Sequence, residues 1–276
     1  MSEMLSYGFM QRALLAALLV GLTAPAVGIF LVQRRLALLG DGIGHVALTG
    51  VALGFLLGTA PVLTAVVVAS AGAVLIEVMR SRAGTSGDVA LALLFYGGLA
   101  GGVLLIGLAP GGSNANLLAY LFGSLTTVAP SDLALIGGLA AVVLALLGTF
   151  GRELFAVCHD EEHARVAGLH VRALTLMLAV LGAVTVTVSM RVVGLLLVSA
   201  LMVVPVAAAQ VLATSFRATA VGAMAIGVAA AVSGTTLSYQ ADVAPGAAIV
   251  VLTLAVFVVT STVAALRARR PSQLPA

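Results

Sequence analysis

The sequence predicts an all-α fold, a polytopic bundle of eight or nine transmembrane helices. Of its 276 residues, 62% are hydrophobic and only 8% are charged. A water-soluble domain of this size has to present a polar exterior, which this composition cannot supply. Long stretches without a charged residue also recur along the chain. Several of them reach the roughly 20 residues that a helix needs to cross a bilayer.

The distribution of arginine predicts the orientation of the helices. All 13 basic residues are arginines, and only Arg12 and Arg191 lie outside gaps that can face one side of the membrane. Those gaps hold Arg34, Arg35, Arg80, Arg82, Arg152, Arg165, Arg172, Arg217, Arg267, Arg269 and Arg270. Because positively charged loops stay in the cytoplasm, we expect these gaps and the C-terminus there. The net charge of +3 therefore indicates topology and no nucleic-acid partner.

The apolar stretches and the charge bias together define nine expected spans. They cover residues 9–32, 37–58, 62–79, 89–109, 131–149, 173–189, 193–214, 219–237 and 245–266. The apolar part of 113–130 is too short to cross, so we expect a short outer or re-entrant segment there. Residues 150–172 form the one substantial cytoplasmic loop. The whole chain, 1–276, is expected to be a single integral membrane domain.

Closely spaced glycines mark the fourth expected span. Gly97 and Gly101, interleaved with Gly98 and Gly102, form two overlapping patterns of small residues four apart. Such patterns let the backbones of neighbouring membrane helices approach closely. We therefore expect a structural role in helix packing for these glycines.

Asp41 and His45 are the polar residues that most need an explanation. Residues four apart share a helix face, and His45 lies about 15 Å past the arginine-marked boundary at 1.5 Å per residue. A charged side chain at that depth costs roughly 2.5–3.5 kcal/mol on insertion scales. Either the two side chains bond to each other and fix the packing, or they coordinate a divalent cation such as zinc or manganese. The default for ionisable residues inside a membrane favours the second hypothesis.

A second histidine pattern lies in the expected cytoplasmic loop. His159, Glu162 and His163 match H-x-x-E-H, a pattern found in zinc peptidases. A solvated amphipathic helix explains so short a pattern better. The pattern nevertheless defines one alternative function, an intramembrane zinc peptidase.

Five motifs follow one another along the chain. They are "RRLALLGDGIGHVALTGVALG" at 34–54, "LLAYLFGSL" at 117–125, "VAPSDL" at 128–133, "EHARVAGLH" at 162–170 and "VGLLLVSALMVVPVAAAQVLA" at 193–213. In this order they resemble the membrane permeases of bacterial ABC transporters for zinc and manganese uptake, and the high-affinity zinc uptake subunit most closely. The last motif is similar to a late helix of the family that carries a proline, here Pro205. One departure is Pro245, which lies one position later than in the usual D-x-P-x-G pattern.

The resemblance implies a non-enzymatic permease subunit of an ATP-driven importer in the bacterial inner membrane. Its implied partners are cytoplasmic ATP-binding subunits, an extracytoplasmic metal-binding protein and a second copy of the chain. No permanent cofactor is implied, and zinc is the expected transported ion, with manganese as the alternative. Asp41 and His45 match the metal-coordinating pair of the family. Glu162, Ala164 and Gly168 match the loop helix that couples to the ATPase.

The composition is consistent with ATP hydrolysis on a separate subunit, because the P-loop motif needs a lysine and this chain has none. A secondary transporter driven by an ion gradient is a further alternative. That class often has inverted repeats, which are not evident in this sequence. Whether Asp132, Asp242 or Asn114 help to receive the metal at the outer mouth stays open.

Overall fold

In the computed structural model, the described residues are 4, 6–82, 87–108, 119–124 and 128–268. Nine helices among them are long and apolar enough to cross a membrane, and the described residues contain no strand. The nine are α2 (Gly8–Gln33), α3 (Leu39–Leu57), α4 (Pro61–Arg82), α5 (Gly87–Leu108), α7 (Pro130–His159), α9 (Val171–Ser189), α10 (Leu195–Leu212), α11 (Phe216–Ala241) and α12 (Pro245–Ala268). The predicted polytopic helix bundle is confirmed.

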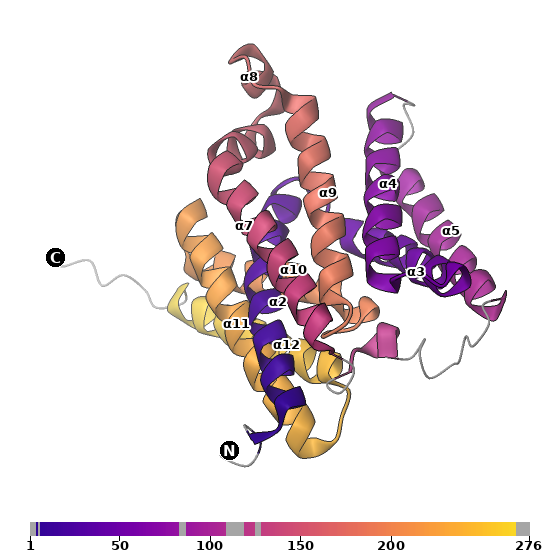
Figure 1. The fold of residues 1–276 in the computed structure, drawn as a ribbon. Helices are drawn as coiled ribbons and strands as arrows, with labels where there is room; N and C mark the ends of the chain where they lie inside the picture. The colour runs from indigo at the N-terminus through magenta and orange to yellow at the C-terminus, as the bar shows by residue number, and fades with distance from the viewer. Residues whose placement is uncertain (1–3, 5, 83–86, 109–118, 125–127, 269–276) are drawn as a thin grey trace.

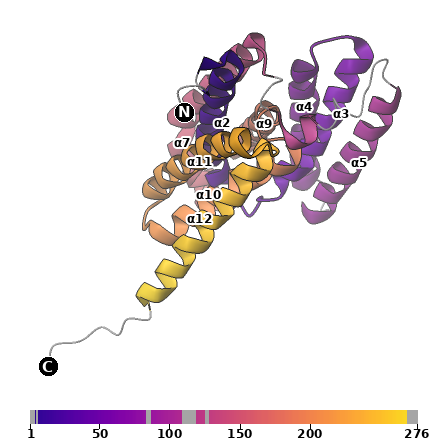
Figure 2. The same ribbon diagram turned by 90° about the horizontal axis from the view of Figure 1, so that it is seen from below.

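The helices form two flanks around a buried centre (Figures 1 and 2). α3, α4 and α5 gather on one flank, and α10, α11 and α12 lie on the other. α3 packs most extensively against α5 and α4, whereas α2 packs against α11 and α4 against α9. α2, α3 and α9 are the most buried spans, and α5, α7 and α12 are among the least buried. The start of α3 therefore lies deep in the bundle, next to the peripheral helix α5.

The expected loop at 150–172 is largely helical. α7 continues from residue 149 to His159, because no proline or strong turn sequence interrupts it. Asp160 then ends α7 and begins α8 (Glu161–Val166), where its carboxylate accepts a hydrogen bond of 2.9 Å from the backbone N–H of His163. This is an ordinary helix N-cap. α8 consequently projects from the end of two long helices.

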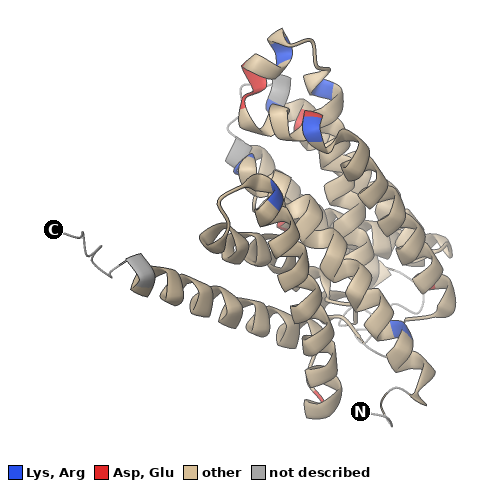
Figure 3. Cartoon of the chain, turned by 90° about the vertical axis from the view of Figure 1, so that its left-hand side faces the viewer, with Lys and Arg blue, Asp and Glu red and all other residues tan. Residues whose placement is uncertain are grey.

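Charged residues are concentrated at one end of the molecule (Figure 3). This end, called here the α8 end, includes α8, the 34–38 turn and the start of α9. Arg34 forms an ion pair of 3.1 Å with Glu161, which ties the end of α2 to α8. The middle parts of the helices carry few charges, as the sequence predicts for membrane spans.

The two arginines that did not fit the charge bias lie at the opposite end, called here the Arg191 end. Arg12, in the first turns of α2, donates from Nε to the carbonyl of Val128 at 2.9 Å. Arg191 pairs with Asp132 at the start of α7 and donates to the hydroxyl of Tyr120 at 3.2 Å. Both arginines therefore have local partners, although Nε of Arg191 is buried without one, and they do not contradict the positive-inside pattern.

A short helical segment covers the Arg191 end. Residues 119–122 form one helical turn, and Gly123 follows with a φ of 77°. A Cβ at Gly123 would lie 2.3 Å from the carbonyl oxygen of Val192, and one at Gly194 would lie 2.4 Å from the carbonyl carbon of Phe122. The two backbones thus touch at positions where only glycine fits. The rest of the expected re-entrant segment, including Asn114, lies outside the described residues.

Small residues bring α5 against α3, although in a different register from the expected one. A Cβ at Gly98 would lie 2.7 Å from the backbone of His45, and one at Gly102 would lie 2.9 Å from Leu48. Gly101 lies beside the side chain of Thr49, but Gly97 has no neighbour within 4 Å. Gly97 therefore makes no close contact within this chain, and its expected packing role stays a prediction. One residue along a helix is a rotation of about 100°, so Gly98 faces α3 and Gly97 faces away.

Candidate metal site

α3 begins directly after a tight turn at the end of α2. Arg35 adopts a left-handed conformation with a φ of 58°, and the Leu36 N–H bonds back to the carbonyl of Leu31 at 2.8 Å. Asp41 is the acidic residue in the first turn of α3. The unpaired N–H groups at a helix N-terminus favour a negative charge there. Asp41 therefore occupies a position that acidic residues commonly take at the start of a helix.

Asp41 borders an open hollow between α3 and α5. The hollow has a volume of about 350 Å³ and is lined by Leu38, Asp41, Leu91, Ala92, Phe95 and Tyr96. Its rim is exposed, since Leu38 is 65% and Tyr96 is 68% accessible. This cavity, called here the Asp41 hollow, gives the carboxylate access to a small ligand.

His45 lies one turn further into the bundle and is 6% exposed. Its ring meets the ring of Phe95 edge-on, with centroids 4.2 Å apart. Nδ1 of His45 is buried without a hydrogen-bond partner. Leaving a buried polar atom unsatisfied costs about 1–3 kcal/mol. The geometry therefore favours a ligand for this nitrogen, which a cation or a water molecule can supply.

Glycines let neighbouring helices approach this pair closely. A Cβ at Gly40 would lie 2.8 Å from Oγ of Ser199 in α10, and Gly98 of α5 lies against the backbone of His45. Gly42 likewise faces Leu91 of α5. These glycines therefore give α3 close contacts with two neighbouring helices, α5 and α10.

The pair does not form a complete metal site within one chain. No group of three or more His, Cys, Asp or Glu side chains in the described part of the chain could hold a metal ion. Structural zinc sites have four ligands, and harder divalent ions take six or more. Two protein ligands therefore leave most coordination positions to water or to a second molecule.

The same finding contradicts the peptidase hypothesis. His159 stacks on Phe155 at 5.8 Å at the end of α7, and Glu162 and His163 are exposed on α8. The H-x-x-E-H residues do not belong to any group that could bind a metal. They instead occupy the solvated helix end that the composition favoured.

The acids considered for the outer mouth have other roles. Asp132 accepts a hydrogen bond of 3.1 Å from the N–H of Ala129 and pairs with Arg191. Asp242 is exposed and ends α11 in a left-handed conformation with a φ of 52°. Asp132 thus joins the start of α7 to Arg191, and both of these bonds are accepted by its Oδ2.

The three expected coupling residues occupy different positions on and after α8. Ala164 is 1% exposed and anchors the helix against the core. Gly168 has a φ of 84°, and the bonds from Leu169 N–H to Ala164 and from Gly168 N–H to Arg165 form a Schellman motif. Glu162 is exposed in the first turn. The helix is therefore seated by Ala164 and stopped by Gly168, with Glu162 on its accessible side. Pro205 lies buried in α10 and removes one backbone hydrogen bond there.

Sequence reasoning missed Glu77 of α4, which is 8% exposed. It borders a cavity of about 560 Å³, called here the Glu77 cavity, that is enclosed by the 34–39 turn, α4 and the start of α5. It also borders the α8 cavity, about 650 Å³, where α4 faces Glu161 and the start of α9. The sequence did contain a signal for this residue. Glu77 stands at the end of an apolar stretch, and Arg80 follows three residues later.

Comparison with known proteins identifies the family of this chain. Residues 6–264 match the model of the ABC 3 transport family. The manganese import system permease protein ScaB of Streptococcus parasanguinis is 33% identical over 92% of this chain and 90% of its own length. A probable iron transport system membrane protein of Haemophilus influenzae is 30% identical over 97% and 98%. The structure of PsaBC from Streptococcus pneumoniae in complex with Fab has a chain that matches with a TM-score of 0.86 and 31% identity, over 94% and 93%. This chain therefore belongs to the ABC 3 transport family.

Proposed function

We propose that this chain is the permease subunit of an ATP-driven importer of divalent transition-metal ions, with Asp41 and His45 as ligands along the path. The observation that carries the proposal is the unpartnered Nδ1 of His45, buried one helical turn from an accessible carboxylate in a membrane-spanning helix. An ionisable pair in such a place is costly unless it faces a path for ions.

Two protein ligands suit transport better than storage. A path must bind an ion well enough to admit it and weakly enough to release it. We propose that a second copy of this chain covers the exposed rim of the Asp41 hollow, formed by Leu38 and Tyr96. The two copies together would then exclude lipid from the ion path.

The energy for transport is proposed to come from separate ATP-binding subunits. The absence of lysine leaves the chain without a P-loop motif. We propose that Glu162, Ala164 and Gly168 form the contact with the ATPase, because α8 projects at the arginine-rich end that the positive-inside rule places in the cytoplasm. The C-terminus is assigned to the same side. An extracytoplasmic binding protein would deliver the ion at the Arg191 end.

Manganese and zinc are both candidate substrates, and the relatives support manganese first. ScaB is named for manganese import and the Haemophilus influenzae relative for iron transport. A carboxylate suits manganese, while imidazole also suits zinc, so the donor atoms of Asp41 and His45 admit either ion. Zinc is the second candidate, because the imidazole of His45 is a ligand type that zinc also takes.

The proposed function is tested by uptake of radioactive manganese in cells that lack their own manganese and zinc importers. The cells express this chain with its ATPase and binding protein, or with the ATPase left out. We expect uptake only in the complete system, with competition by unlabelled manganese stronger than by zinc. Uptake that persists without the ATPase would favour a gradient-driven transporter and overturn the proposal. Stronger competition by zinc would reverse the order of the two ions.

A further inference from the structure

Glu77 is a buried acid for which the proposed function has no role. It lies in α4, a membrane-spanning helix, and its side chain is only 11% exposed. Asp41 and His45 are explained by the metal path, but Glu77 is on a different helix. An ionisable group inside a membrane span is costly to retain and is a functional candidate by default.

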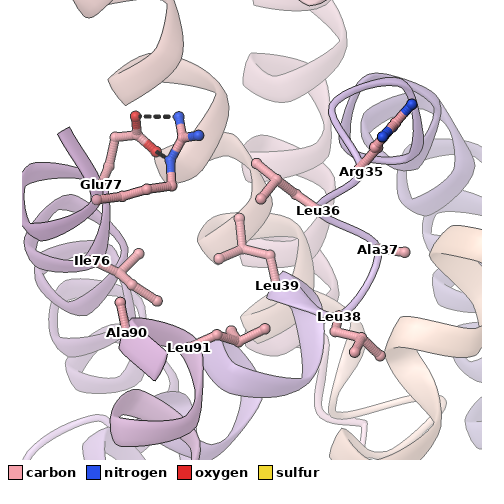
Figure 4. A pocket seen from close by; sticks show the side chains of 10 residues that line it. Arg35, Leu36, Ala37, Leu38, Leu39, Ile76, Glu77, Ala90 and Leu91 are labelled. Atoms are coloured by element: carbon pink, nitrogen blue, oxygen red, sulfur yellow. Dashed lines mark hydrogen bonds and ion pairs between the residues drawn. The ribbon is translucent and has the colours of Figure 1, made fainter. Parts of the chain in front are cut away.

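Glu77 lies at the junction of the cavities that lead away from Asp41. The Glu77 cavity shares Leu38 and Leu91 with the Asp41 hollow, and Glu77 itself lines both the Glu77 cavity and the α8 cavity. Figure 4 shows Glu77 on the α4 side of its cavity, opposite the turn that carries Leu36 and Leu38. Three adjoining cavities therefore run from Asp41 to the α8 end, and Glu77 borders the last two.

The Glu77 cavity is large enough for a hydrated ion. A water molecule occupies about 30 Å³ in the liquid, so an ion with six waters needs roughly 200 Å³. The cavity has about 560 Å³. Among the described residues that line it, Glu77 is the only acid. A cation that leaves Asp41 through this space therefore meets one carboxylate.

Arg80 limits how strongly that carboxylate can hold a cation. It donates from Nε to Oε2 of Glu77 at 3.1 Å and from Nη2 to Oε1 at 2.8 Å. A carboxylate has about four lone-pair sites, so two are left for another ligand. The charge of Arg80 opposes a second cation, which keeps binding weak enough for release. The side chain of Arg80 is 34% exposed, so it has space to withdraw as an ion arrives.

We infer that Glu77 is a second binding station for the transported divalent cation, between Asp41 and the α8 end, with Arg80 as its competing counter-charge. This inference rests on the proposed function and extends it to a residue outside the matched motifs. The ion binds through the free lone pairs of the carboxylate and leaves through the α8 cavity.

A binding titration tests the station without transport. The full chain is purified into lipid nanodiscs in a background of Asp41→Ala and His45→Ala, and Mn²⁺ binding is measured by electron paramagnetic resonance. We expect Glu77→Gln to remove the remaining saturable binding. Arg80→Gln should instead tighten it at least about tenfold, because a nearby positive charge is removed. Binding that Glu77→Gln leaves unchanged, or that Arg80→Gln weakens, would overturn the inference.

Uptake by the complete transporter supplies the second readout. We expect Glu77→Gln to lower manganese uptake at least about tenfold, as for other lost metal contacts, and Glu77→Asp to keep a larger share. The double variant Glu77→Gln with Arg80→Gln should stay inactive. Recovery in the double variant would mean that Glu77 only neutralises Arg80, and would overturn the inference. Asp242→Asn at the exposed end of α11, outside the three cavities, is the control and should transport normally.

The two experiments separate this inference from the proposed function. A wild-type chain that takes up no metal with its partners would overturn the proposed function, while the titration would still judge Glu77. Normal wild-type uptake together with normal uptake by Glu77→Gln would overturn the station alone.

Discussion

The two ends of the bundle are held together in different ways. At the Arg191 end, charged and polar groups are bonded to one another, as in the contacts of Arg191 with Asp132 and Tyr120. Backbone also meets backbone there at Gly123 and Gly194. Towards the α8 end, the start of α3 borders cavities, and Asp41 opens onto one of them. The first end is built for closure, and the second leaves space for an ion.

This difference concerns the two ends of the proposed ion path. At the Arg191 end, Asp132 is already paired with Arg191, so an arriving ion meets a carboxylate whose charge is countered. The cavities near Asp41 and Glu77 extend instead towards α8, where Arg34 and Glu161 join the end of α2 to that helix. Under the proposed function, motion of α8 is transmitted to the 34–38 turn and from there to Asp41 and His45.

The largest expected effect on stability is at the closed end. Arg191→Ala leaves Asp132 without its charged partner in a site where the two side chains are only 18% and 16% exposed. Removing one partner of a buried ion pair costs several kcal/mol, so we expect a loss of about 3 kcal/mol in the free energy of unfolding. Thermal unfolding of the purified chain in detergent measures it. Arg165→Ala removes an exposed pair and should cost less than about 1 kcal/mol. Equal losses of unfolding free energy in Arg191→Ala and Arg165→Ala would contradict the difference between a buried and an exposed ion pair.

A smaller effect is expected where α5 meets α3. Gly98→Leu places a side chain against the backbone of His45, and overpacking of this kind costs roughly 1–3 kcal/mol. We expect metal uptake to fall more than about tenfold, because the backbone that carries His45 has to shift. Gly97→Leu is the matched control, since its position has no neighbour within 4 Å. A larger loss of uptake in Gly97→Leu than in Gly98→Leu would contradict this prediction. It would show that Gly97 faces a partner outside the single chain.

The smallest effect is expected at the end of α8. Gly168→Ala forces a side chain into a left-handed conformation with a φ of 84°, which costs roughly 1 kcal/mol. Gly148→Ala in α7 has open space around it and should stabilise the helix by up to about 1 kcal/mol. Thermal unfolding of both variants checks the sign of each change. A stabilised Gly168→Ala variant would show that the Schellman turn does not fix α8.

The sequence was sufficient to predict most of the fold, because the lengths of apolar stretches and the positions of arginines are local properties. It also placed Asp41 and His45 on one helix face. The register of the glycine contact was not predictable, since Gly97 and Gly98 are equivalent until α3 is placed beside them. The bond between Arg191 and Asp132 and the cavities around Glu77 depend on which helices are neighbours. Helix periodicity alone does not give that information.

The most direct test of the metal path is uptake by variants of the pair itself. Asp41→Ala and His45→Ala are compared with Thr49→Val, one turn further along the same face, whose hydroxyl bonds to the carbonyl of Gly98 at 2.7 Å. Each chain is expressed with its partners, and radioactive manganese uptake is normalised to the amount of chain in the membrane. We expect both pair variants to lose at least about tenfold and Thr49→Val to transport near the wild-type rate. Wild-type uptake by Asp41→Ala and His45→Ala would contradict a metal path through this pair.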